Sequence, residues 1–498
     1  MSKEIARILN ELAQLGVRPA RLATDSRAVG AGDVFLAYPG ERADGRRFVA
    51  DAAARGAAAV LWERAGFAWP AALATPNLPV AGLKRLAGPI AAEVYGRPSE
   101  RLWTVGVTGT NGKTSCSQWI AQALTRAGRR CAVVGTLGLG FPGALADNPN
   151  TTPDAVLLQQ ALRRFADEGA ACVALEASSI GLEQGRLEGT RCACALFTNL
   201  TRDHLDYHAD MEAYAEAKMR LFRAGGLGHA VLNLDDALGV RIAHMLAFGP
   251  VRRVGYSVGR GAAAASGLEH WLEAHEAAVS AEGIAFRLES SWGGCAIRAP
   301  LIGRFNVSNL LGVIGTLLVA GLRLDEIPGL CARLAPPPGR MQRLGGGAAP
   351  LAVVDYAHSP DALDKCLTAL RDVARAQGGR LICVFGCGGD RDRGKRPLMG
   401  EIASRHAALV VVTSDNPRSE DPAAIAAEIV SGVRVPHAVH LDRRAAIRAA
   451  IAAARRGDVV LIAGKGHEPY QEVDGQRLPF SDVDETRAAL ASAGAVAC

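Results

Sequence analysis

The sequence has no long uncharged apolar run, little net charge and no paired cysteines at metal-site spacing, and each shortage excludes a class of protein. Its longest uncharged apolar segment, residues 309–322, has about 14 residues, whereas a membrane-spanning helix needs about 20. We expect a buried helix there instead. The net charge of +6, from 56 Lys and Arg against 50 Asp and Glu, gives little support to nucleic-acid binding but suits anionic small molecules.

The eleven cysteines also argue against a zinc site or a disulfide framework. The pairs Cys192/Cys194 and Cys383/Cys387 have no second matching pair or histidine at zinc spacing, so buried free thiols are the better interpretation. The N-terminal segment MSKEIARILNELAQLG carries charges where an export signal would be apolar, and it predicts an amphipathic helix. Together these features indicate a cytoplasmic protein.

What is present is a soluble α/β composition that is too long for one hydrophobic core. The chain has 498 residues, of which 49% are hydrophobic and 21% charged, and single cores stop growing at roughly 250–300 residues. A Gly- and Pro-containing stretch, YGRPSERL, ends the first hundred residues, and the run APPPGR at 335–340 interrupts the pattern again. Since adjacent prolines cannot continue a helix or a central strand, we expect three domains over 1–100, 101–336 and 337–498.

In the second and third segments, apolar strand-like runs alternate with helix-like runs. The strand-like runs include WTVGVTG, ACVALEAS and CALFTNL in the second segment, and LAVVDYAHSP, RLICVFGCGG and DVVLIAGKGHE in the third. Such alternation predicts doubly wound, mainly parallel sheets, whose ligands bind beyond the carboxyl ends of the strands. Most of the conspicuous polar residues of the chain follow directly after these strands.

The segment TVGVTGTNGKTS predicts a phosphate-binding loop. Gly109 and Gly112 would let backbone N–H groups face a polyphosphate, Lys113 would reach its outer phosphates, and Thr114 could bind Mg²⁺ at a helix N-terminus. The pattern is incomplete, because Val107 stands where the usual motif has its first glycine. A purely structural Gly-Lys-Thr turn is the alternative.

Further candidate site residues of the second segment follow its strands. Glu176 ends a strand and could bind Mg²⁺ beside Thr114, or could serve helix-capping chemistry. The loop TRDHLDYH brings together Asp203, His204, Asp206 and His208, which solvated turn residues would also resemble. Lys218 lies on the expected inward face of a helix, where a lysine is costly unless paired or modified; a snorkelling surface lysine is the alternative.

The third segment has polar loops after successive strands. They are 355–361, 386–397, 413–422 and 463–468. The basic run Arg391, Arg393, Lys395 and Arg396 suits phosphates or carboxylates, and Arg418 offers a planar fork for a carboxylate. Solvated charged surfaces are the alternative for each loop taken alone.

Taken together, these residues make the chain resemble the Mur ligase family over nearly its whole length. The ATP-dependent enzymes of this family build the peptide stem of peptidoglycan. The motifs are TGTNGKT at 108–114, NTTPD at 150–154, EASS at 176–179, TNLTRDHLDYH at 198–208, the helix of Lys218, FNVSN at 305–309, GRMQR at 339–343, DYAHSPDAL at 355–363 and GKGHE at 464–468. The run Asp415-Asn416-Pro417-Arg418 resembles members that add meso-2,6-diaminopimelate, rather than lysine, to UDP-MurNAc-L-Ala-D-Glu.

The resemblance implies an α/β fold in which each domain has a separate substrate. A mixed α/β N-terminal domain (1–100) would bind UDP-MurNAc, a central P-loop ATPase-like parallel-sheet domain (101–336) would bind ATP, and a Rossmann-like C-terminal domain (337–498) would bind the amino acid. Activity would require ATP and Mg²⁺ and proceed through an acyl phosphate. A cytoplasmic monomer that binds no nucleic acid and does not insert into a membrane is expected.

The resemblance also assigns the site residues. Lys113, Glu176, His204 and Lys218 would be catalytic, with Thr114, Glu176, His204 and a carbamylated Lys218 (N6-carboxylysine) as metal ligands. The implied ATP contacts are Thr108, Gly109, Thr110, Asn111, Gly112, Lys113, Thr114, Asn306, Arg340 and His358. The implied contacts to UDP-MurNAc-dipeptide are Ser26, Asn150, Thr151, Thr152, Ser178, Gln184 and Arg186. Those to diaminopimelate are Arg391, Asp415, Asn416, Pro417, Arg418, Gly464 and Glu468.

One position departs from the family, and other functions compete. Relatives commonly have S-S-H-G where this chain has Ile180, so a polar role there is absent or moved elsewhere. Another Mur-type ligase or a folylpolyglutamate synthase is the nearest alternative function, and Arg418 together with the first domain discriminates against both. A nucleotide-dependent switch without ligation would need neither Lys218 nor a cationic acceptor site.

Overall fold

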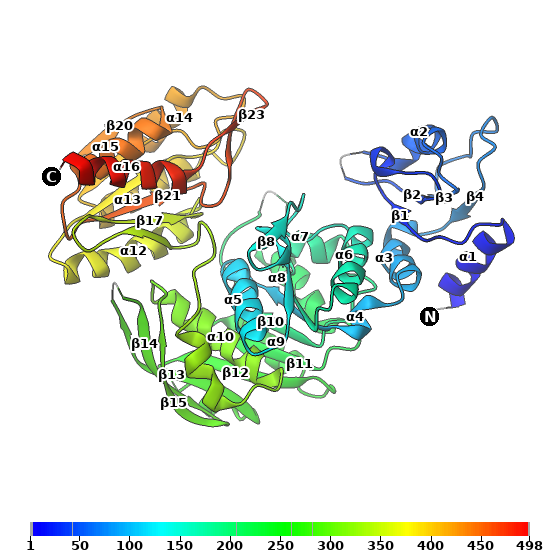
Figure 1. Cartoon of the computed structure of the whole chain (residues 1–498), viewed down its shortest axis with the longest axis horizontal. Helices are drawn as coiled ribbons and strands as arrows, with labels where there is room; N and C mark the ends of the chain where they lie inside the picture. Colours follow the sequence, from blue (N-terminus) through cyan, green and yellow to red (C-terminus); the bar gives the residue numbers. More distant parts are fainter. Residues whose placement is uncertain (1–2, 42, 206, 260, 281, 497–498) are drawn as a thin grey trace.

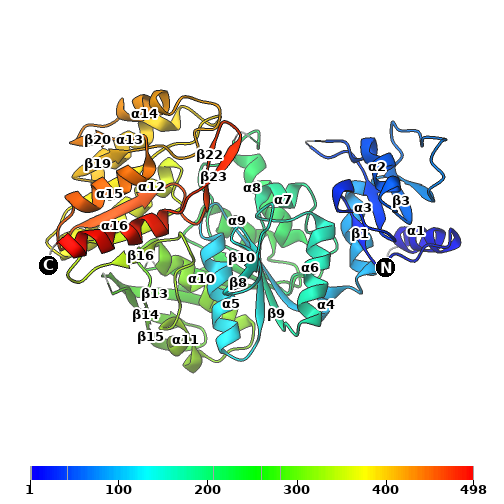
Figure 2. The ribbon, with the colours of Figure 1, turned by 45° about the horizontal axis from the view of Figure 1, so that its top comes forward.

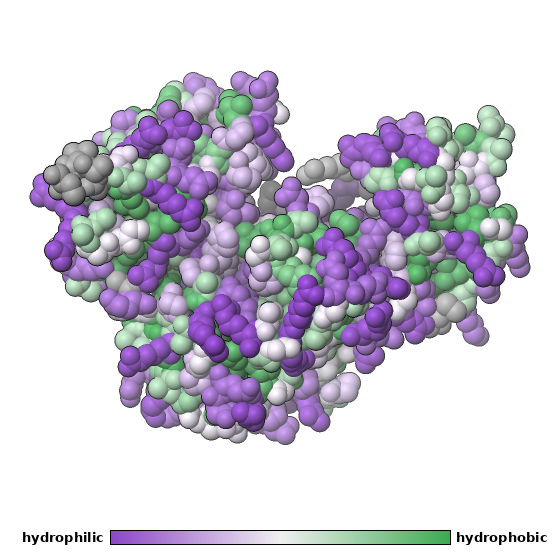
Figure 3. All heavy atoms as spheres, viewed as in Figure 1, coloured by the Kyte–Doolittle hydropathy of each residue, from purple (hydrophilic) through white to green (hydrophobic). Residues whose placement is uncertain are grey.

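The computed structural model describes residues 3–41, 43–205, 207–259, 261–280 and 282–496. The N-terminal part, in blue, and the C-terminal part, in yellow to red, lie on opposite sides of a central part in both ribbon views (Figures 1 and 2). A hollow separates the two outer parts above the central one on the face shown in Figure 3, where hydrophilic residues dominate. Asp206 lies outside the described residues. Within them, no helix has the length and apolarity needed to cross a membrane.

The N-terminal part is a parallel sheet, of strand order β1-β2-β3-β4, packed against helices. Its helix α1 buries Ile5, Ile8 and Leu12 on one face, which confirms the predicted amphipathic helix. The elements are β1 (Leu22–Ala23), β2 (Val34–Ala37), β3 (Ala59–Glu63), β4 (Asn77–Val80), α1 (Lys3–Gln14), α2 (Val49–Ala54), α3 (Leu83–Val94), α4 (Pro98–Arg101) and the 3₁₀ turns η1 (Ser26–Ala28) and η2 (Gly45–Phe48).

Close contacts join this part to the central one. The Tyr95 hydroxyl accepts hydrogen bonds from the Leu22 backbone N–H at 2.8 Å and from Gln160 Nε2 at 3.0 Å. Gly88 of α3 approaches the Glu188 carbonyl so closely that a Cβ there would lie 2.0 Å from the oxygen. Only glycine fits this contact, so the sequence itself fixes how near α3 can come.

The central part is one sheet with strand order β15-β14-β13-β12-β11-β10-β5-β9-β6-β7-β8. In this order the strands between β13 and β6 are parallel, and the pairs at both edges are antiparallel. Its strands are β5 (Trp103–Thr108), β6 (Cys131–Gly135), β7 (Gly138–Phe141), β8 (Ala144–Ala146), β9 (Cys172–Glu176), β10 (Cys194–Phe197), β11 (His229–Asn233), β12 (Arg252–Val258), β13 (His270–Val279), β14 (Ile284–Ser290) and β15 (Gly293–Ala299).

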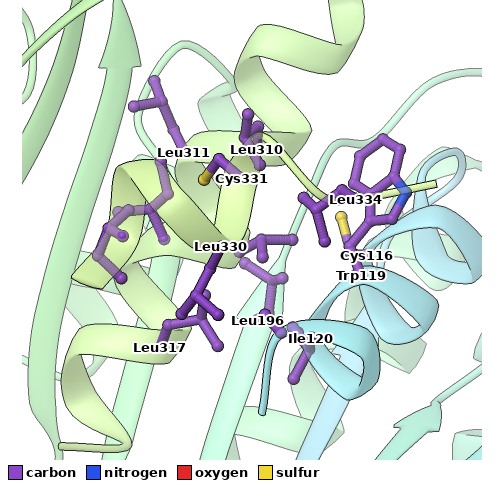
Figure 4. Close-up of a cluster of buried hydrophobic side chains, with 14 of the residues drawn as sticks. Cys116, Trp119, Ile120, Leu196, Leu310, Leu311, Leu317, Leu330, Cys331 and Leu334 are labelled. Carbon is purple, nitrogen blue, oxygen red and sulfur yellow. The ribbon is translucent and has the colours of Figure 1, made fainter. Parts of the chain in front are cut away.

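Helices cover both faces of this sheet. They are α5 (Lys113–Arg126), α6 (Ala155–Asp167), α7 (Ser179–Glu183), α8 (Met211–Met219), α9 (Ala237–Met245), α10 (Phe305–Val319) and α11 (Ile327–Cys331), with the 3₁₀ turns η3 (Arg220–Arg223), η4 (Ala264–Ser266) and η5 (Leu324–Glu326). Helix α10 buries almost its whole surface, as expected for the uncharged apolar segment. Figure 4 shows its leucines packed with side chains of α5, β10 and α11.

Trp119 of α5 is the largest side chain in this core and gives a stability prediction. It is 1% exposed, and its Nε1 donates to the Ala335 carbonyl at 3.0 Å. Replacing a buried Trp by Ala costs about 3–5 kcal/mol. We therefore expect Trp119→Ala to lower the free energy of unfolding by that amount, measured as a lower urea midpoint. Trp292→Ala, at a partly buried ring that stacks on His270, should cost about 1 kcal/mol; equal losses in both variants would contradict the prediction.

The C-terminal part is a second doubly wound sheet, of strand order β16-β17-β21-β18-β19-β20, parallel except at β16. The elements are β16 (Gln342–Gly345), β17 (Leu351–Asp355), β18 (Leu381–Phe385), β19 (Leu409–Val412), β20 (His437–Val439), β21 (Val459–Ala463), α12 (Pro360–Ala376), α13 (Lys395–His406), α14 (Pro422–Val430), α15 (Arg443–Ala453) and α16 (Asp482–Val496), with the hairpin β22 (Tyr470–Val473) and β23 (Gln476–Pro479). The predicted three-part α/β fold, with its central parallel sheet and Rossmann-like C-terminal part, is confirmed.

Most cysteines of the described residues are buried within these cores. Of those in the described residues, Cys295 alone is partly exposed, and none forms a disulfide. Burial raises the pKa of the Cys192 thiol to about 12 and that of Cys387 to about 12. These thiols are therefore packing residues, as the sequence predicted.

Candidate active site

Adjoining clefts open at the carboxyl ends of the strands of the central and C-terminal sheets. The first has a volume of about 520 Å³ and lies between the loop after β5 and the loop after β17. The second has a volume of about 1150 Å³ and lies mainly against the C-terminal sheet. Asp203, His204, Tyr356 and His358 line both clefts. A group bound in one cleft could therefore pass to a molecule bound in the other.

The loop 109–114 enters the first cleft with the backbone expected of a phosphate-binding loop. Gly109 has φ +151° and Gly112 has φ +87°, and helix α5 begins at Lys113. A Cβ on Gly109 would lie 1.9 Å from Thr198 Oγ1, and one on Gly112 would lie 2.5 Å from Asn309 Oδ1. Both glycines are therefore required by conformation and by space, and the backbone N–H groups at the start of α5 face a polar cleft.

Lys113 is half-buried and lies back over its own loop. Its Nζ donates to the carbonyls of Gly109 and Thr110, both at 2.9 Å. Burial lowers the pKa of Lys113, and the negative charges of Glu176 and Asp203 partly oppose that shift. The ammonium is therefore poorly compensated by the protein, which favours an anionic partner in the cleft.

Glu176 ends β9 almost completely buried, at 1% exposure, yet lines the first cleft. Its Oε2 accepts from Thr114 Oγ1 at 2.9 Å and from Thr136 Oγ1 at 3.0 Å, and its Oε1 accepts from the Thr136 backbone N–H at 2.9 Å. The helix-capping alternative does not apply, since Ser178 caps the helix that follows β9 and the Glu176 contacts come from the Thr114 side chain in the first turn of α5 and from Thr136 after β6. The carboxylate is held rigidly beside the Thr114 hydroxyl.

Lys218 of α8 is fully buried, which excludes the snorkelling alternative. Its Nζ lies 4.1 Å from the centroid of the Tyr214 ring and lines the first cleft. The pKa of Lys218 lies well below its usual range, because burial disfavours the cation and Lys113 adds a like charge, while Asp203 acts in the opposite direction. A neutral amine at this position can act as a nucleophile.

His204 follows Asp203 in a strained loop. Its φ is +53°, its side chain is 44% exposed, and its ring lies edge-on to Tyr214 with centroids 6.0 Å apart. Met341, Asp390 and Arg418, which lie in other loops of the two clefts, also have positive φ. Non-glycine residues in this region are uncommon and cluster at functional sites.

The C-terminal part brings Arg340 and His358 to the first cleft, and α10 brings Asn306. Arg340 Nη2 lies 3.5 Å from Thr114 Oγ1, and its guanidinium lies 4.5 Å from the centroid of Tyr356. His358 Nδ1 lies 2.8 Å from the Tyr356 carbonyl. Asn306 lines the cleft and accepts from Asn309 Nδ2 at 3.0 Å. Of the predicted ATP contacts, Thr108 and Gly109 do not line either cleft.

Some of the residues predicted to bind UDP-MurNAc-dipeptide line the first cleft, and others lie outside both clefts. Asn150, Thr151, Ser178 and Arg186 line the first cleft, as does Ile180. Three others line neither cleft. Thr152 is buried and donates to the Glu176 carbonyl at 2.7 Å, Gln184 donates to the Tyr207 hydroxyl at 3.2 Å, and Ser26 is 8% exposed in the N-terminal part.

The second cleft collects the residues predicted to bind the amino acid, apart from Pro417, which is buried in the same loop. Those that line it are Arg391, Asp415, Asn416, Arg418, Gly464 and Glu468. Arg418 Nη1 donates to the Gly389 carbonyl at 2.7 Å, and its Nε lies 3.3 Å from Glu472 Oε2. The guanidinium is thus held in place from both sides.

Glu468 is the anionic group of this cleft. It accepts from Lys465 Nζ at 2.9 Å and from Asn416 Nδ2 at 3.0 Å. Burial alone would raise the pKa of Glu468, but the charge of Lys465 and these hydrogen bonds outweigh it, so the pKa lies below its usual value. A carboxylate near Arg391 and Arg418 gives the cleft both signs of charge.

The described residues contain no group of three His, Cys, Asp or Glu side chains that could hold a metal ion by themselves. The Thr114 hydroxyl and the Glu176 carboxylate nevertheless offer hard oxygen donors side by side. Mg²⁺ is commonly held by one or two carboxylates together with phosphates of a substrate. The donor set therefore fits Mg²⁺ that arrives with a polyphosphate.

The structure adds site residues that the sequence analysis missed. Thr136 and Asn199 each follow a strand, β6 and β10 respectively, and line the first cleft. The strand-end rule could have found both. Tyr356, which lines both clefts, stood inside a predicted polar turn without an assigned role. Asn309 ended the FNVSN motif, also without an assigned role, and lines the first cleft.

Comparisons with known proteins place the chain in a family. The family model described as "Mur ligase middle domain" matches residues 107–317, "Mur ligase, glutamate ligase domain" matches 339–466, and "Mur ligase family, catalytic domain" matches 20–95. The chain therefore belongs to the Mur ligase family, and the resemblance seen in its motifs is confirmed.

Within that family, relatives that are about 50% identical over nearly the whole chain share one name. UDP-N-acetylmuramoyl-L-alanyl-D-glutamate--2,6-diaminopimelate ligase of Chromobacterium violaceum is 50% identical over 485 residues, covering 97% of this chain and 96% of that protein. A solved structure of a protein with the same name is 39% identical, covers 95% of each chain and has a TM-score of 0.69. Folylpolyglutamate synthase of Mycobacterium tuberculosis, solved with ADP and AMPPCP, covers 76% of this chain and 92% of its own, at 20% identity and a TM-score of 0.60, and shows the shared fold alone.

Proposed function

We propose that the protein joins meso-2,6-diaminopimelate to UDP-MurNAc-L-Ala-D-Glu, with conversion of ATP to ADP and phosphate, in the synthesis of peptidoglycan precursors. The observation that carries this proposal is the pair of adjoining clefts. One has a phosphate-binding loop with Lys113, and the other has Arg391, Arg418 and Glu468 around it. The names of relatives that are about 50% identical over nearly the whole chain support the same reaction.

In the first cleft, the D-glutamyl carboxylate would attack the outer phosphate of ATP and form an acyl phosphate. Lys113 and the N–H groups at the start of α5 would hold the phosphates, and Arg340 would add positive charge beside Thr114. Mg²⁺, held by Thr114, Glu176, His204 and carbamylated Lys218, would neutralise charge on the phosphates. The remaining role of these side chains is to orient the reacting groups and exclude water.

The carbamate of Lys218 follows from its chemistry. Burial disfavours the ammonium form of Lys218, and the neutral amine can add to CO₂ with loss of a proton, which gives an anionic carbamate in place of a costly cation. The like-charge repulsion between Lys218 and Lys113 would be removed, and the carbamate would be an anion near the Lys113 ammonium. This modification supplies the oxygen donor that the described protein side chains lack.

In the second cleft, diaminopimelate would be recognised at its distal end. Arg418 offers a planar fork for the distal carboxylate, a group that the amino acid lysine does not have. Glu468 would accept hydrogen bonds from an ammonium group. The opposite amine would then attack the acyl phosphate at the border of the clefts, where Asp203, His204 and His358 lie.

The test is phosphate release by the purified protein with ATP, Mg²⁺ and UDP-MurNAc-L-Ala-D-Glu, with either diamino acid. We expect phosphate release with meso-diaminopimelate. With L-lysine the release should be lower by about two orders of magnitude or more, because lysine lacks the distal carboxylate and leaves the polar groups of the site unpaired. Release with L-lysine alone would overturn the specificity, and release that depends on no amino acid would favour the nucleotide switch. Removal of Mg²⁺ with EDTA should stop release in every mixture.

Arg418 gives a sharper test of the same assignment. We expect Arg418→Ala to raise KM for diaminopimelate about 100-fold, because a bidentate charged contact is lost, while KM for ATP changes less than about twofold. Arg434→Ala is the matched control. Its Nη1 donates to the carbonyls of Ser431 and Val433, just after the C-terminal end of α14, and no KM should change. A rise in KM for both substrates in Arg418→Ala would count against the assignment.

A further inference from the structure

Arg443 is a buried cation that the proposed reaction does not use. It is the first residue of α15, and its guanidinium is fully buried together with the carboxylate of Asp482. The pair is bidentate: Arg443 Nε lies 2.7 Å from Asp482 Oδ1, and Nη2 lies 2.8 Å from Oδ2. Buried charges of this kind are often replaceable by apolar residues without loss of stability, so stability alone does not explain the pair.

The remaining hydrogen bonds of Arg443 go to the starts of the loops of the second cleft. Nη1 donates to the Ser414 carbonyl at 3.3 Å, and Nη2 donates to the Ala463 carbonyl at 2.9 Å. Ser414 directly precedes Asp415, and Ala463 directly precedes Gly464. These loops follow β19 and β21, which are separated in the sheet by β18. Arg443 therefore links loops that no strand pairing joins.

The linked loops are in close contact at that point. A Cβ on Gly464 would lie 2.3 Å from Asp415 Oδ2 and 3.7 Å from Arg443 Nη2. A small shift of either loop would displace Asp415, Asn416 or Gly464. Burial by itself would lower the pKa of Arg443, but Asp482, Asp415 and Glu468 outweigh it and hold the pKa above its usual value.

Asp482, the partner of Arg443, lies at the end of the segment that begins with the loop 464–468. The chain runs from Gly464 through Glu468 and the hairpin β22–β23 to Asp482, where α16 begins. On the way, the Arg418 N–H donates to the Glu472 carbonyl at 3.0 Å, and the Asp474 N–H donates to the Arg418 carbonyl at 2.8 Å. Arg443 thus holds both ends of the segment 464–482 and the start of the loop that the hairpin supports.

We infer that the Arg443–Asp482 pair is a positioning device that sets the spacing of the loops 415–418 and 464–468 and thereby the affinity for the acceptor amino acid. The inference rests on the proposed function, because it takes those loops as the diaminopimelate site. Neither residue lines a cleft, so the effect is exerted through the loops and not by contact with substrate.

The test uses Arg443→Lys, which keeps the charge but cannot make the same set of hydrogen bonds. We expect KM for diaminopimelate to rise about tenfold or more, since displacement of binding groups by 1 Å can cost as much as 100-fold. KM for ATP and for UDP-MurNAc-L-Ala-D-Glu should stay within about twofold of wild type. The double variant Arg443→Met with Asp482→Leu, which leaves no unpaired buried charge, should fold and show the same selective rise.

The matched control is the Arg380–Asp458 pair, whose residues precede β18 and β21 at the opposite edge of the same sheet. Arg380 Nη2 lies 2.8 Å from Asp458 Oδ2, and the Asp458 residue precedes β21 just as Gly464 follows it. Asp458→Asn should lower the melting temperature without raising KM for diaminopimelate. If wild type does not use diaminopimelate, the proposed function fails. If wild type does but Arg443→Lys keeps its KM, or raises every KM alike, the positioning role fails. Loss of folding in both Arg443 variants would assign the pair to stability alone and overturn it too.

Discussion

Lys113→Met is expected to lower phosphate release by about 1000-fold or more, because one preorganised charge on the transferring phosphate contributes roughly 100- to 1000-fold and Lys113 also holds ATP. Its Nζ lies 2.9 Å from the carbonyls of Gly109 and Thr110, close enough to turn from the loop to a phosphate. The measurement is phosphate release at saturating UDP-MurNAc-L-Ala-D-Glu and diaminopimelate.

The fold should survive this change. Burial lowers the pKa of Lys113, so the unfolded chain binds the proton more tightly than the folded one. The lysine therefore costs stability at neutral pH, and this cost fades as pH rises toward the ordinary lysine pKa. Lys113→Met should melt at or above the wild-type temperature at pH 7. Lys84→Met, at an exposed position of α3, is the control for activity, and phosphate release by Lys113→Met within tenfold of that control would contradict the role.

The strand ends were the most informative part of the sequence for locating the site. Glu176, Asp355 and Gly464 were each placed at the end of a buried run, and β9, β17 and β21 end at or next to them. Because parallel strands share one carboxyl edge, this pattern alone brings such residues to one side of each sheet. It does not tell which loops meet between the sheets, so the shared border at Tyr356 and His358 could not be derived.

Other features depend on contacts that no local pattern encodes. The strands β12 to β15 extend the central sheet, with antiparallel pairing from β13 to β15, and none of their runs ends in a polar or Gly-rich loop as conspicuous as those of the site. Arg443 was not singled out in the sequence, and only packing shows that α16 returns to bury it. The roles of the site residues stay predictions, whereas the family and fold are established.

Lys218→Ala is the second change with a large expected effect, and it separates a carbamate from a simple ammonium. We expect kcat to fall about 100- to 1000-fold, since a metal ligand in a closed cleft is removed, while KM for diaminopimelate changes less than about twofold because Lys218 lines only the first cleft. The measurement is the same phosphate release, with melting temperature as the check on folding.

The rescue experiment decides which species acts. If the working group is a carbamate, its essential part is a carboxylate, so acetate or formate diffusing into the space left in Lys218→Ala should restore part of kcat, and methylamine should not. Wild type depleted of CO₂ should lose activity and regain it with bicarbonate, whereas Lys218→Ala should not respond to bicarbonate. Rescue by methylamine would assign the role to the ammonium instead. That result would conflict with the burial of Lys218, because burial lowers its pKa and disfavours the ammonium, and the remaining metal ligands would have to come from substrate phosphates alone.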